Sequence, residues 1–458
     1  MNEQERAHSA ARARAAAREL AARQIVAVAL TWVDTAGITR VKTVPVTRLE
    51  HAAAWGVGVS PVFDAYLADD TVIAGRYAGS PVGDLRLHPD LDRLTILGAP
   101  AGWAWAPADR YDQDGAAHPQ DARALLRGQA ARLTAQGLAA RAAFEIEWAV
   151  SQGPGEEFVP AARGPAYGMT RIVELPEYLL DVLGSLAAAG VEVEQLHPEY
   201  AAGQYEVSVA AEDPVGAADT SVLVRQTIRA VTIRHGMRAS FSPKVVADGV
   251  GNGFHVHLSL WRDGADLMAG GSGPYGMRAE AEAFAAGVLA RLPALLAVGC
   301  PTVASYLRLV PSQWSGPFAC WGLENREAAL RFVTGPAGQR SRAANFEVKC
   351  FDAAADPYLL LTVLLAAGRD GLAGGARLPD PVNVDPASLD EAERAARHVA
   401  RLPSSLAEAV AAFESDPVLR EALGEPVAGT VVDVRRGEIA RFEGAAPEEI
   451  AARTRWLH

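Results

Sequence analysis

Three segments of the chain place acidic or basic side chains two residues apart among apolar neighbours. Successive side chains of a strand point to opposite faces, so residues two apart share one face. A carboxylate in apolar surroundings costs several kcal/mol unless it is paired. The pairs are Glu145 with Glu147, His255 with His257, and Glu347 with Lys349, while a fourth segment carries Glu199 and Glu206 on either side of a bend.

These five glutamates would repel one another in a shared pocket unless a strong positive charge lay among them. Two divalent metal ions would supply that charge, and oxygen-rich ligation with one imidazole suits magnesium or manganese better than zinc. The three cysteines lack metal-site spacing and are expected to be buried, reduced thiols (Cys300, Cys320 and Cys350). The sequence therefore predicts a two-metal site. Taken alone, the glutamate pair has a solvated sheet face as its alternative, and His255 with His257 has core packing or a surface position.

Three arginines supply fixed positive charge further along the chain, namely Arg308, Arg326 and Arg331. Guanidinium groups bind carboxylates and phosphates at two points. Structural ion pairs with Glu324 or Glu327 are the alternative. The sequence has no Walker-type phosphate loop and no dinucleotide glycine fingerprint, so a nucleotide would have to be held by metal ions and arginines.

The elements that must position these residues indicate an α+β protein with two domains. A helix is expected over residues 5–23, followed by a hairpin of residues 25–33 and 39–46. Beyond Pro107, helices over 121–135, 176–189 and 220–235 alternate with strands over 142–150, 191–195 and 254–260. We therefore expect a small β-rich N-terminal domain with a leading helix (residues 1–106) and a large α+β domain (residues 107–458).

Composition and charge argue against two classes of partner, nucleic acids and membranes. The 458 residues carry a net charge of −12 with no lysine or arginine block, which argues against a nucleic-acid partner. No unbroken apolar run approaches the ~18–20 residues that cross a bilayer, and residues 358–367 come nearest, so no membrane partner is expected. Glutamates interrupt the alanine- and arginine-rich start, unlike a targeting peptide, and we expect a cytoplasmic protein.

The order of the motifs resembles the glutamine synthetase family. Glu145-Ile146-Glu147 precedes the other family-like segments, which are His197–Glu199, Gly203–Glu206, Phe241–Lys244, Gly251–Ser259, Ser305–Pro311, Asn325–Arg331 and Glu347–Lys349. Residues 32–42 are similar to the start of the family's N-terminal domain, so the resemblance covers nearly the whole chain. It implies a β-grasp N-terminal domain and a catalytic domain with a curved antiparallel sheet flanked by helices. It also implies homo-oligomeric rings of six subunits, usually doubled to twelve, that share active sites.

Carried over by position, the resemblance assigns roles to single residues. One metal ion would be held by Glu147, Glu199 and Glu206, and a second by Glu145, His255 and Glu347. Glutamate would be bound by Gly251, Arg308 and Lys349. ATP would be contacted by Glu194, His257, Ser259, Arg326 and Arg331. The family reaction uses ATP and two to three Mg²⁺ or Mn²⁺ ions to phosphorylate the glutamate side chain, and Arg308 and Arg326 are its expected catalytic residues.

The departures from the family lie mainly in the ammonium pocket. Six residues after Arg308, where glutamine-forming members carry a glutamate, this chain has Trp314, and Val57 stands at the place of a second acid. Ammonium needs anionic or acceptor ligands, whereas an indole can pack on a carbon chain and attract a cationic head. Core packing in a displaced loop is the alternative for Trp314. Asn345 also replaces an arginine that contacts the nucleotide.

These features favour an ATP-dependent ligase that joins the γ-carboxylate of glutamate to a primary organic amine, as a step in amine utilisation and nitrogen metabolism. Ethanolamine, a polyamine or another small amine would be the acceptor, and the apolar Trp314 without an evident further acid favours a small monoamine. The general base is unassigned. The alternatives are ordinary glutamine synthesis with a rebuilt ammonium site, and a non-catalytic ring-forming paralogue that serves as scaffold or nitrogen sensor.

Overall fold

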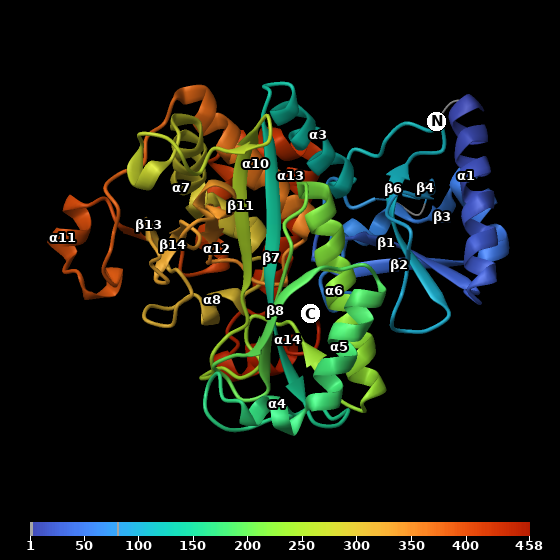
Figure 1. Ribbon diagram of the computed structural model, residues 1–458, viewed down its shortest axis with the longest axis horizontal. Coiled ribbons are helices and arrows are strands. Elements are labelled where there is room, and N and C mark those ends of the chain that lie inside the picture. The colour runs from blue at the N-terminus through green and yellow to red at the C-terminus, as the bar shows by residue number, and fades with distance from the viewer. Residues whose placement is uncertain (1–2, 80–81) are drawn as a thin grey trace.

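The computed structural model describes residues 3–79 and 82–458, and its N-terminal part is a small sheet flanked by a long helix (Figure 1). The strand order is β2-β1-β6-β4-β3, with β5 paired to β6, and among the described strands of this sheet β1 and β6 run parallel while the other pairs are antiparallel. The elements are α1 (Glu3–Ala22), β1 (Ala27–Val33), β2 (Thr39–Pro45), α2 (Leu49–Trp55), β3 (Val57–Val59), β4 (Leu85–Pro89), β5 (Thr95–Ile96) and β6 (Trp103–Tyr111). The predicted leading helix and hairpin are confirmed.

The hairpin turn between β1 and β2 lies directly against the catalytic domain. Gly37 adopts a φ of +79°, which glycine tolerates best. A Cβ atom added there would lie 2.0 Å from the carbonyl oxygen of Ala354. A glycine is therefore required both by the turn and by the close approach of the two domains.

The predicted domain boundary at residues 106/107 falls inside β6, which still pairs with β4 at Tyr111. Pro107 does not end the strand, because a proline keeps its carbonyl acceptor, and that oxygen takes the N–H of Asp90 at 2.9 Å. Strand β6 thus continues past the predicted boundary. We propose that the boundary lies between Tyr111 and Asp121, where the first helix of the catalytic domain begins.

The catalytic domain is built on a curved sheet of order β16-β13-β14-β15-β11-β7-β9-β8, with β10 and β12 attached at β7 and β11. All its pairs are antiparallel except β13 with β14, so the predicted fold class is confirmed with this one parallel pair added. The strands are β7 (Ala139–Ser151), β8 (Val193–Pro198), β9 (Gln204–Val209), β10 (Arg238–Ser240), β11 (Phe254–Arg262), β12 (Ala265–Asp266), β13 (Phe318–Leu323), β14 (Ala328–Val333), β15 (Asn345–Val348) and β16 (Ala400–Arg401).

Helices surround this sheet, and the three predicted ones are present (Figure 1). The helix expected over 220–235 begins earlier, because the Asp213 carboxylate caps it by accepting the N–H groups of Val215 and Gly216. The helices are α3 (Ala122–Thr134), α4 (Thr170–Glu174), α5 (Pro176–Ala188), α6 (Pro214–Arg234), α7 (Ala279–Gly299), α8 (Ser305–Arg308), α9 (Arg340–Ala343), α10 (Pro357–Gly374), α11 (Glu391–Ala396), α12 (Leu406–Glu414), α13 (Pro417–Arg441) and α14 (Pro447–Thr454).

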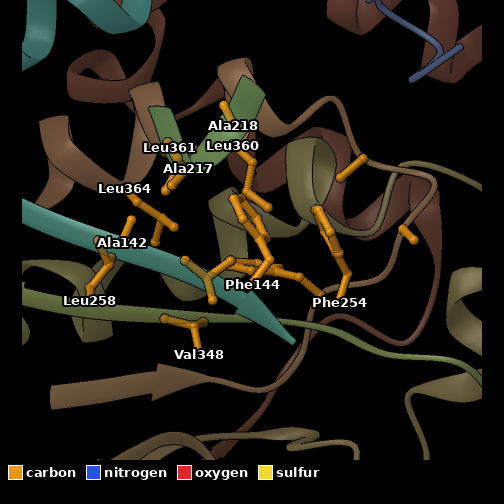
Figure 2. Packing of buried hydrophobic residues seen from close by; sticks show 14 of the residues in the cluster. Ala142, Phe144, Ala217, Ala218, Phe254, Leu258, Val348, Leu360, Leu361 and Leu364 are labelled. Carbon is orange, nitrogen blue, oxygen red and sulfur yellow. The ribbon is translucent and has the colours of Figure 1, made fainter. Parts of the chain in front are cut away.

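One face of the central strands forms the core. Phe144 of β7 and Phe254 of β11 stack with ring centroids 4.2 Å apart. Leucines of α10 and small residues of α6 cover them, and Figure 2 labels Leu360, Leu361, Leu364, Ala217 and Ala218 there. Because side chains alternate along a strand, the neighbours of these phenylalanines point to the opposite face. The three cysteines are buried and unpaired, as predicted.

Helix α7 corrects the expectation that residues 358–367 come nearest to the length of a membrane-spanning segment. Among the described residues it is the helix long and apolar enough to cross a membrane by length and composition, with a mean hydropathy of 1.6 in its most apolar window. An unbroken-run criterion missed it because Arg291 interrupts the run. Within the protein, 83% of that window is buried, as in a core helix.

Candidate active site

The predicted metal ligands lie on adjacent strands, on the face opposite the core. The register places Glu147 of β7 across from Glu206 of β9, and Glu145 across from His255 of β11. His257 lies across from Glu347 of β15. Glu199 follows β8 directly. The strand alternation predicted from the sequence therefore holds, and it brings all six predicted ligands into one cluster.

A cavity of about 780 Å³ opens over this cluster. Five of the six predicted ligands line it, together with Gly251, Arg308 and Lys349. Glu347, the sixth, is 1% exposed and lies behind His255, whose Nδ1 is 3.4 Å from its Oε1. The predicted glutamate-binding residues therefore share one cavity with most of the predicted ligands.

Three sets of donor atoms lie within 4.8 Å of one another, which is close enough to share a cation. These sets are Glu145 with His257 and Glu347, Glu145 with Glu206 and His255, and His197 with Glu199 and Glu206. They overlap with the two predicted triplets but divide the residues differently. His197 was not predicted, although its place two residues before Glu199 could have suggested it.

Charge in the cluster is unevenly balanced. Burial, and then the charges of Glu145 and Glu147, raise the pKa of Glu206 to about 7. Burial and the charge of Glu147 also raise the pKa of Glu199. Burial opposes ionisation of Glu145 too, but His257 and His255 hold the pKa of that carboxyl well below its usual range. On the β8–β9 side, the carboxylates outnumber their cationic partners.

The cationic side chains surround Glu347. Lys349 Nζ lies 2.8 Å from Glu347 Oε1, and Arg331 Nη1 lies 2.9 Å from Glu347 Oε2. Arg308 is 5% exposed and donates to the carbonyls of Lys349 and Cys350, each at 3.1 Å. Its backbone contacts hold the guanidinium against the cavity, which it lines. Both oxygens of Glu347 are thus already paired within the chain.

A second cavity of about 250 Å³ adjoins the first and shares Glu145 and His257 with it. Glu194 and Ser259, two of the predicted nucleotide contacts, line it, whereas Arg326 and Arg331 line the larger cavity. Arg342 of α9 also lines the smaller cavity. Sequence reasoning missed Arg342. It lies three residues before Asn345, which is the position where the family carries an arginine that contacts the nucleotide.

An aromatic wall closes one side of the larger cavity. The Trp314 and Tyr200 rings meet edge to face with centroids 5.1 Å apart, and Tyr167 packs against Tyr200 at 5.5 Å. The guanidinium of Arg326 lies 5.7 Å from the Trp314 ring. Trp314 is 44% exposed, so it is not a core residue. We call Tyr167, Tyr200 and Trp314 the aromatic wall. Only Trp314 was predicted, since nothing in the sequence links it to the two tyrosines.

Val57, the other residue predicted for the amine pocket, lies elsewhere in the chain. It sits on β3, pairs with Leu87 and packs against the N-terminal core. It is not among the described residues that line the larger cavity. A single subunit therefore does not bring Val57 and Trp314 together.

Comparison with known proteins decides the family. The family described as "Glutamine synthetase, catalytic domain" matches residues 119–453. The chain belongs to the glutamine synthetase family. It is 58% identical to the γ-glutamylpolyamine synthetase GlnA3 of Streptomyces coelicolor over 98% of this chain and 97% of that protein. It is also 31% identical to the glutamine synthetase of Halobacterium salinarum over 95% and 94% of the two chains.

Solved structures of this family share the fold. A crystal structure described as a novel glutamine synthase homologue has a TM-score of 0.84 at 32% identity and covers 95% of this chain and 99% of its own. A complex of GmaS with ADP has a TM-score of 0.82 at 26% identity, with coverage of 94% and 96%. The predicted family and fold are confirmed over nearly the whole chain.

Enzymes of the glutamine synthetase family are ligases that use ATP and divalent metal ions. The donor set fits such ions, because its oxygen and imidazole atoms converge within 4.8 Å and its buried carboxylates lack enough cations within the chain. The thiols offer no competing ligand set, since burial raises the pKa of Cys350 and of Cys320 to about 12.

Proposed function

We propose that the chain is a glutamate–amine ligase that joins the γ-carboxylate of glutamate to a primary amino group of an organic amine, with a di- or polyamine as the preferred class. The observation that carries this proposal is the aromatic wall beside the acid cluster, where ammonium-using relatives need a carboxylate. The 58% identity to a γ-glutamylpolyamine synthetase supports it and moves the preference from a small monoamine to a polyamine.

In this proposal Arg308, with Gly251 and Lys349, binds glutamate so that its side-chain carboxylate reaches the acid cluster. Arg308 suits a carboxylate because a guanidinium offers two parallel donors and burial strengthens them. Its position is rigid, since two backbone carbonyls and the packing around it fix the side chain. Lys349 balances the charge of Glu347.

Phosphoryl transfer from ATP would take place over the same cluster. Arg326 and Arg331 line the cavity and can face the transferred phosphoryl group, and the smaller cavity with Glu194, His257 and Ser259 is adjacent for the nucleotide. The six predicted ligands would hold two to three Mg²⁺ or Mn²⁺ ions, which neutralise phosphoryl charge and align the reacting groups when bound.

The amine would then displace phosphate from the activated glutamate. An indole face and two phenol rings attract a cationic head and pack against the methylene chain, whereas they give ammonium no anionic ligand. The aromatic wall therefore favours an amine with a carbon skeleton.

We also propose, from the family, a cytoplasmic homo-oligomer of six or twelve subunits. This assembly would let Val57 act from a neighbouring subunit, because the family places its active sites between subunits. Sedimentation of the purified chain tests the assembly independently of activity.

The experiment is ADP release by the purified chain with glutamate, ATP and Mg²⁺ or Mn²⁺, supplied separately with putrescine, spermidine, ethanolamine and ammonium. Mass spectrometry identifies the product. Turnover with putrescine or spermidine well above that with ammonium is expected. Turnover only with ammonium would favour glutamine synthesis, and none with any acceptor would favour the non-catalytic paralogue.

The aromatic wall is tested by Trp314→Glu, which restores an acid where ammonium-using members carry one. Use of ammonium relative to organic amines is expected to rise by about 10-fold or more, because a desolvated cation gains a charged partner. Trp55→Glu is the matched control, since Trp55 is an exposed tryptophan outside the cavity. Unchanged selectivity in Trp314→Glu would contradict the role given to the wall.

A further inference from the structure

The loop that carries Trp314 is held in an unfavourable backbone conformation. Ser312, Trp314 and Gly316 have φ angles of +57°, +55° and +65°. Left-handed backbone is natural for the glycine but costs about 1–2 kcal/mol at a residue with a side chain, above all a bulky one. The loop therefore needs contacts that compensate, and these contacts decide where the indole lies.

A buried carboxylate supplies them. Glu327, just before β14, accepts the backbone N–H of Trp314 at 2.7 Å through Oε1, and the backbone N–H of Ser312 lies close enough to lower the pKa of the same carboxyl. Its own N–H is fixed by the Asn325 side chain at 3.0 Å. Glu327 is 6% exposed, and burial raises its pKa. One buried acid thus binds the backbone of Trp314, the bulkiest residue of the loop that adopts left-handed backbone.

The placement of this acid does not suit a direct role in binding substrate. Glu327 is not among the described residues that line the larger cavity, whereas Ser312, Gln313, Trp314 and Ser315 are. Its second oxygen, Oε2, is buried and has no hydrogen-bond partner among the described residues. A buried carboxylate with one unpartnered oxygen is costly, and its charge-assisted bond to the Trp314 N–H is a contact that offsets this cost.

We propose that Glu327 is a positioning residue that sets amine selectivity, because it fixes the Trp314 loop and so holds the indole against Tyr200. This inference rests on the proposed function, and it names the device that keeps the aromatic wall in place. Loss of the carboxylate releases the backbone N–H of Trp314, the loop relaxes toward ordinary φ angles, and the indole leaves the wall.

The test compares Glu327→Ala and Glu327→Gln with Ser312→Ala. The alanine variant loses the bond to the Trp314 N–H, and the glutamine variant keeps an acceptor without the charge. Ser312→Ala is the matched control in the same loop, since it loses only the exposed contact between Ser312 Oγ and Asp385 at 3.2 Å. Melting temperatures show whether each variant is folded.

Steady-state kinetics with putrescine or spermidine give the first measurement. The KM for the amine is expected to rise about 10-fold or more in Glu327→Ala, because the charge-assisted hydrogen bond to the loop is lost. The KM values for glutamate and ATP are expected to stay within about 2-fold. Glu327→Gln should lie between wild type and alanine. Equal effects on all three substrates would overturn the inference.

A double-mutant comparison separates positioning from general stabilisation. In a Trp314→Ala background, Glu327→Ala is expected to have no further effect on the KM for the amine, because the ring that it positions is gone. Additive effects would show that Glu327 acts independently of Trp314 and would overturn the inference.

Hydrogen exchange of the peptide covering residues 312–316 in the unliganded chain needs no turnover. Faster exchange is expected in Glu327→Ala and unchanged exchange in Ser312→Ala. Unchanged exchange in both variants would overturn the positioning contact.

If wild type shows no amine-dependent turnover, the proposed function fails and the selectivity role fails with it. If wild type is active but the amine KM does not move in Glu327→Ala, only the present inference fails.

Discussion

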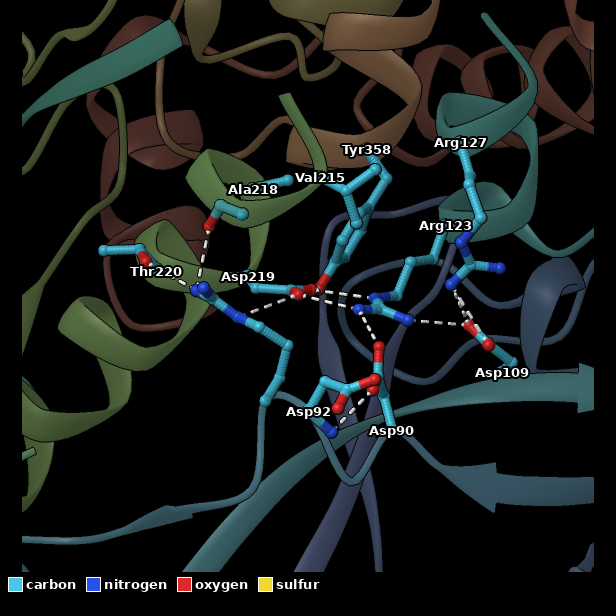
Figure 3. A network of polar contacts seen from close by, with 12 residues as sticks. Asp90, Asp92, Asp109, Arg123, Arg127, Val215, Ala218, Asp219, Thr220 and Tyr358 are labelled. Atoms are coloured by element: carbon cyan, nitrogen blue, oxygen red, sulfur yellow. Dashed lines mark hydrogen bonds and ion pairs between the residues drawn. The ribbon is translucent and has the colours of Figure 1, made fainter. Parts of the chain in front are cut away.

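Two clusters of buried charge in this molecule are built on opposite rules. At the junction of the domains, Arg123 of α3 binds both oxygens of Asp219 at 2.9 Å and also contacts Asp90 and Asp109 (Figure 3). The Tyr358 hydroxyl donates to Asp219 at 2.7 Å. In the cavity, by contrast, Glu199 and Glu206 face other carboxylates, and burial and repulsion raise the pKa of both.

The difference shows which cluster serves stability. Paired buried charges whose hydrogen-bonding positions are filled hold a structure together, and breaking one pair is costly. Like charges gathered without enough cations destabilise the empty protein, so the fold tolerates them only where a ligand supplies the missing charge. The same substitution, acid to amide, should therefore have opposite consequences at the two places.

The largest effect is expected from Glu206→Gln in the cavity. Turnover should fall about 1,000-fold, because bound metal ions lose an anionic ligand and phosphoryl charge loses several kcal/mol of stabilisation. The melting temperature of the metal-free chain should stay the same or rise, since one repelling charge is gone. Thermal melting and ADP release measure the two quantities, and a clear drop in melting temperature would mean that this cluster is also structural.

The next largest effect is expected from Asp219→Asn at the junction. The free energy of unfolding should fall by about 3–5 kcal/mol, because Arg123 stays buried without its two-point partner. The midpoint of urea unfolding checks this. Asp109→Asn is the matched control, since its side chain is 18% exposed and Arg123 keeps Asp219. Equal midpoints for the two variants would contradict the view that Asp219 is the centre of the network.

Much of the fold and of the acid cluster could be predicted from the sequence because local rules govern them. Strand alternation put Glu145 and Glu147 on one face, and the motif order identified the family. The aromatic wall could not be predicted, because Tyr167 and Tyr200 meet Trp314 only through packing between segments far apart in the chain. The parallel pairing of β13 with β14 could not be predicted for the same reason, since the local sequence does not determine which strands pair.

The boundary and the apolar helix show a different limit. Pro107 lies within a strand because its carbonyl is still used, and α7 is apolar on average although Arg291 divides it. In both cases a single residue was given more weight than the surrounding pattern. Glu327, by contrast, was predicted from the sequence only as an alternative ion-pair partner for an arginine. Its role depends on its contact with the backbone N–H of Trp314, and no spacing in the sequence reveals that contact.

The smallest effect is expected at Asp356, a buried acid that lies between the two cases because one of its carboxylate oxygens is hydrogen-bonded and, within the described part of the chain, the other is not. Asp356 caps α10 through the N–H groups of Tyr358 and Leu359, but its Oδ2 is buried without a partner among the described residues. Burial raises its pKa to about 8. The folded chain therefore holds a proton that the unfolded chain releases above about pH 4. The contribution of Asp356 to stability is fully present below about pH 4 and is lost as pH rises to about 8.

Asp356→Asn keeps the capping oxygen and removes the titrating group, so its stability relative to wild type should increase by about 1–3 kcal/mol between pH 5 and pH 8. Urea unfolding at the two pH values measures this change. Asp213→Asn is the matched control, because Asp213 caps α6 in the same way but is exposed to water. A parallel pH dependence in wild type and Asp356→Asn would show that Asp356 remains ionised in the fold.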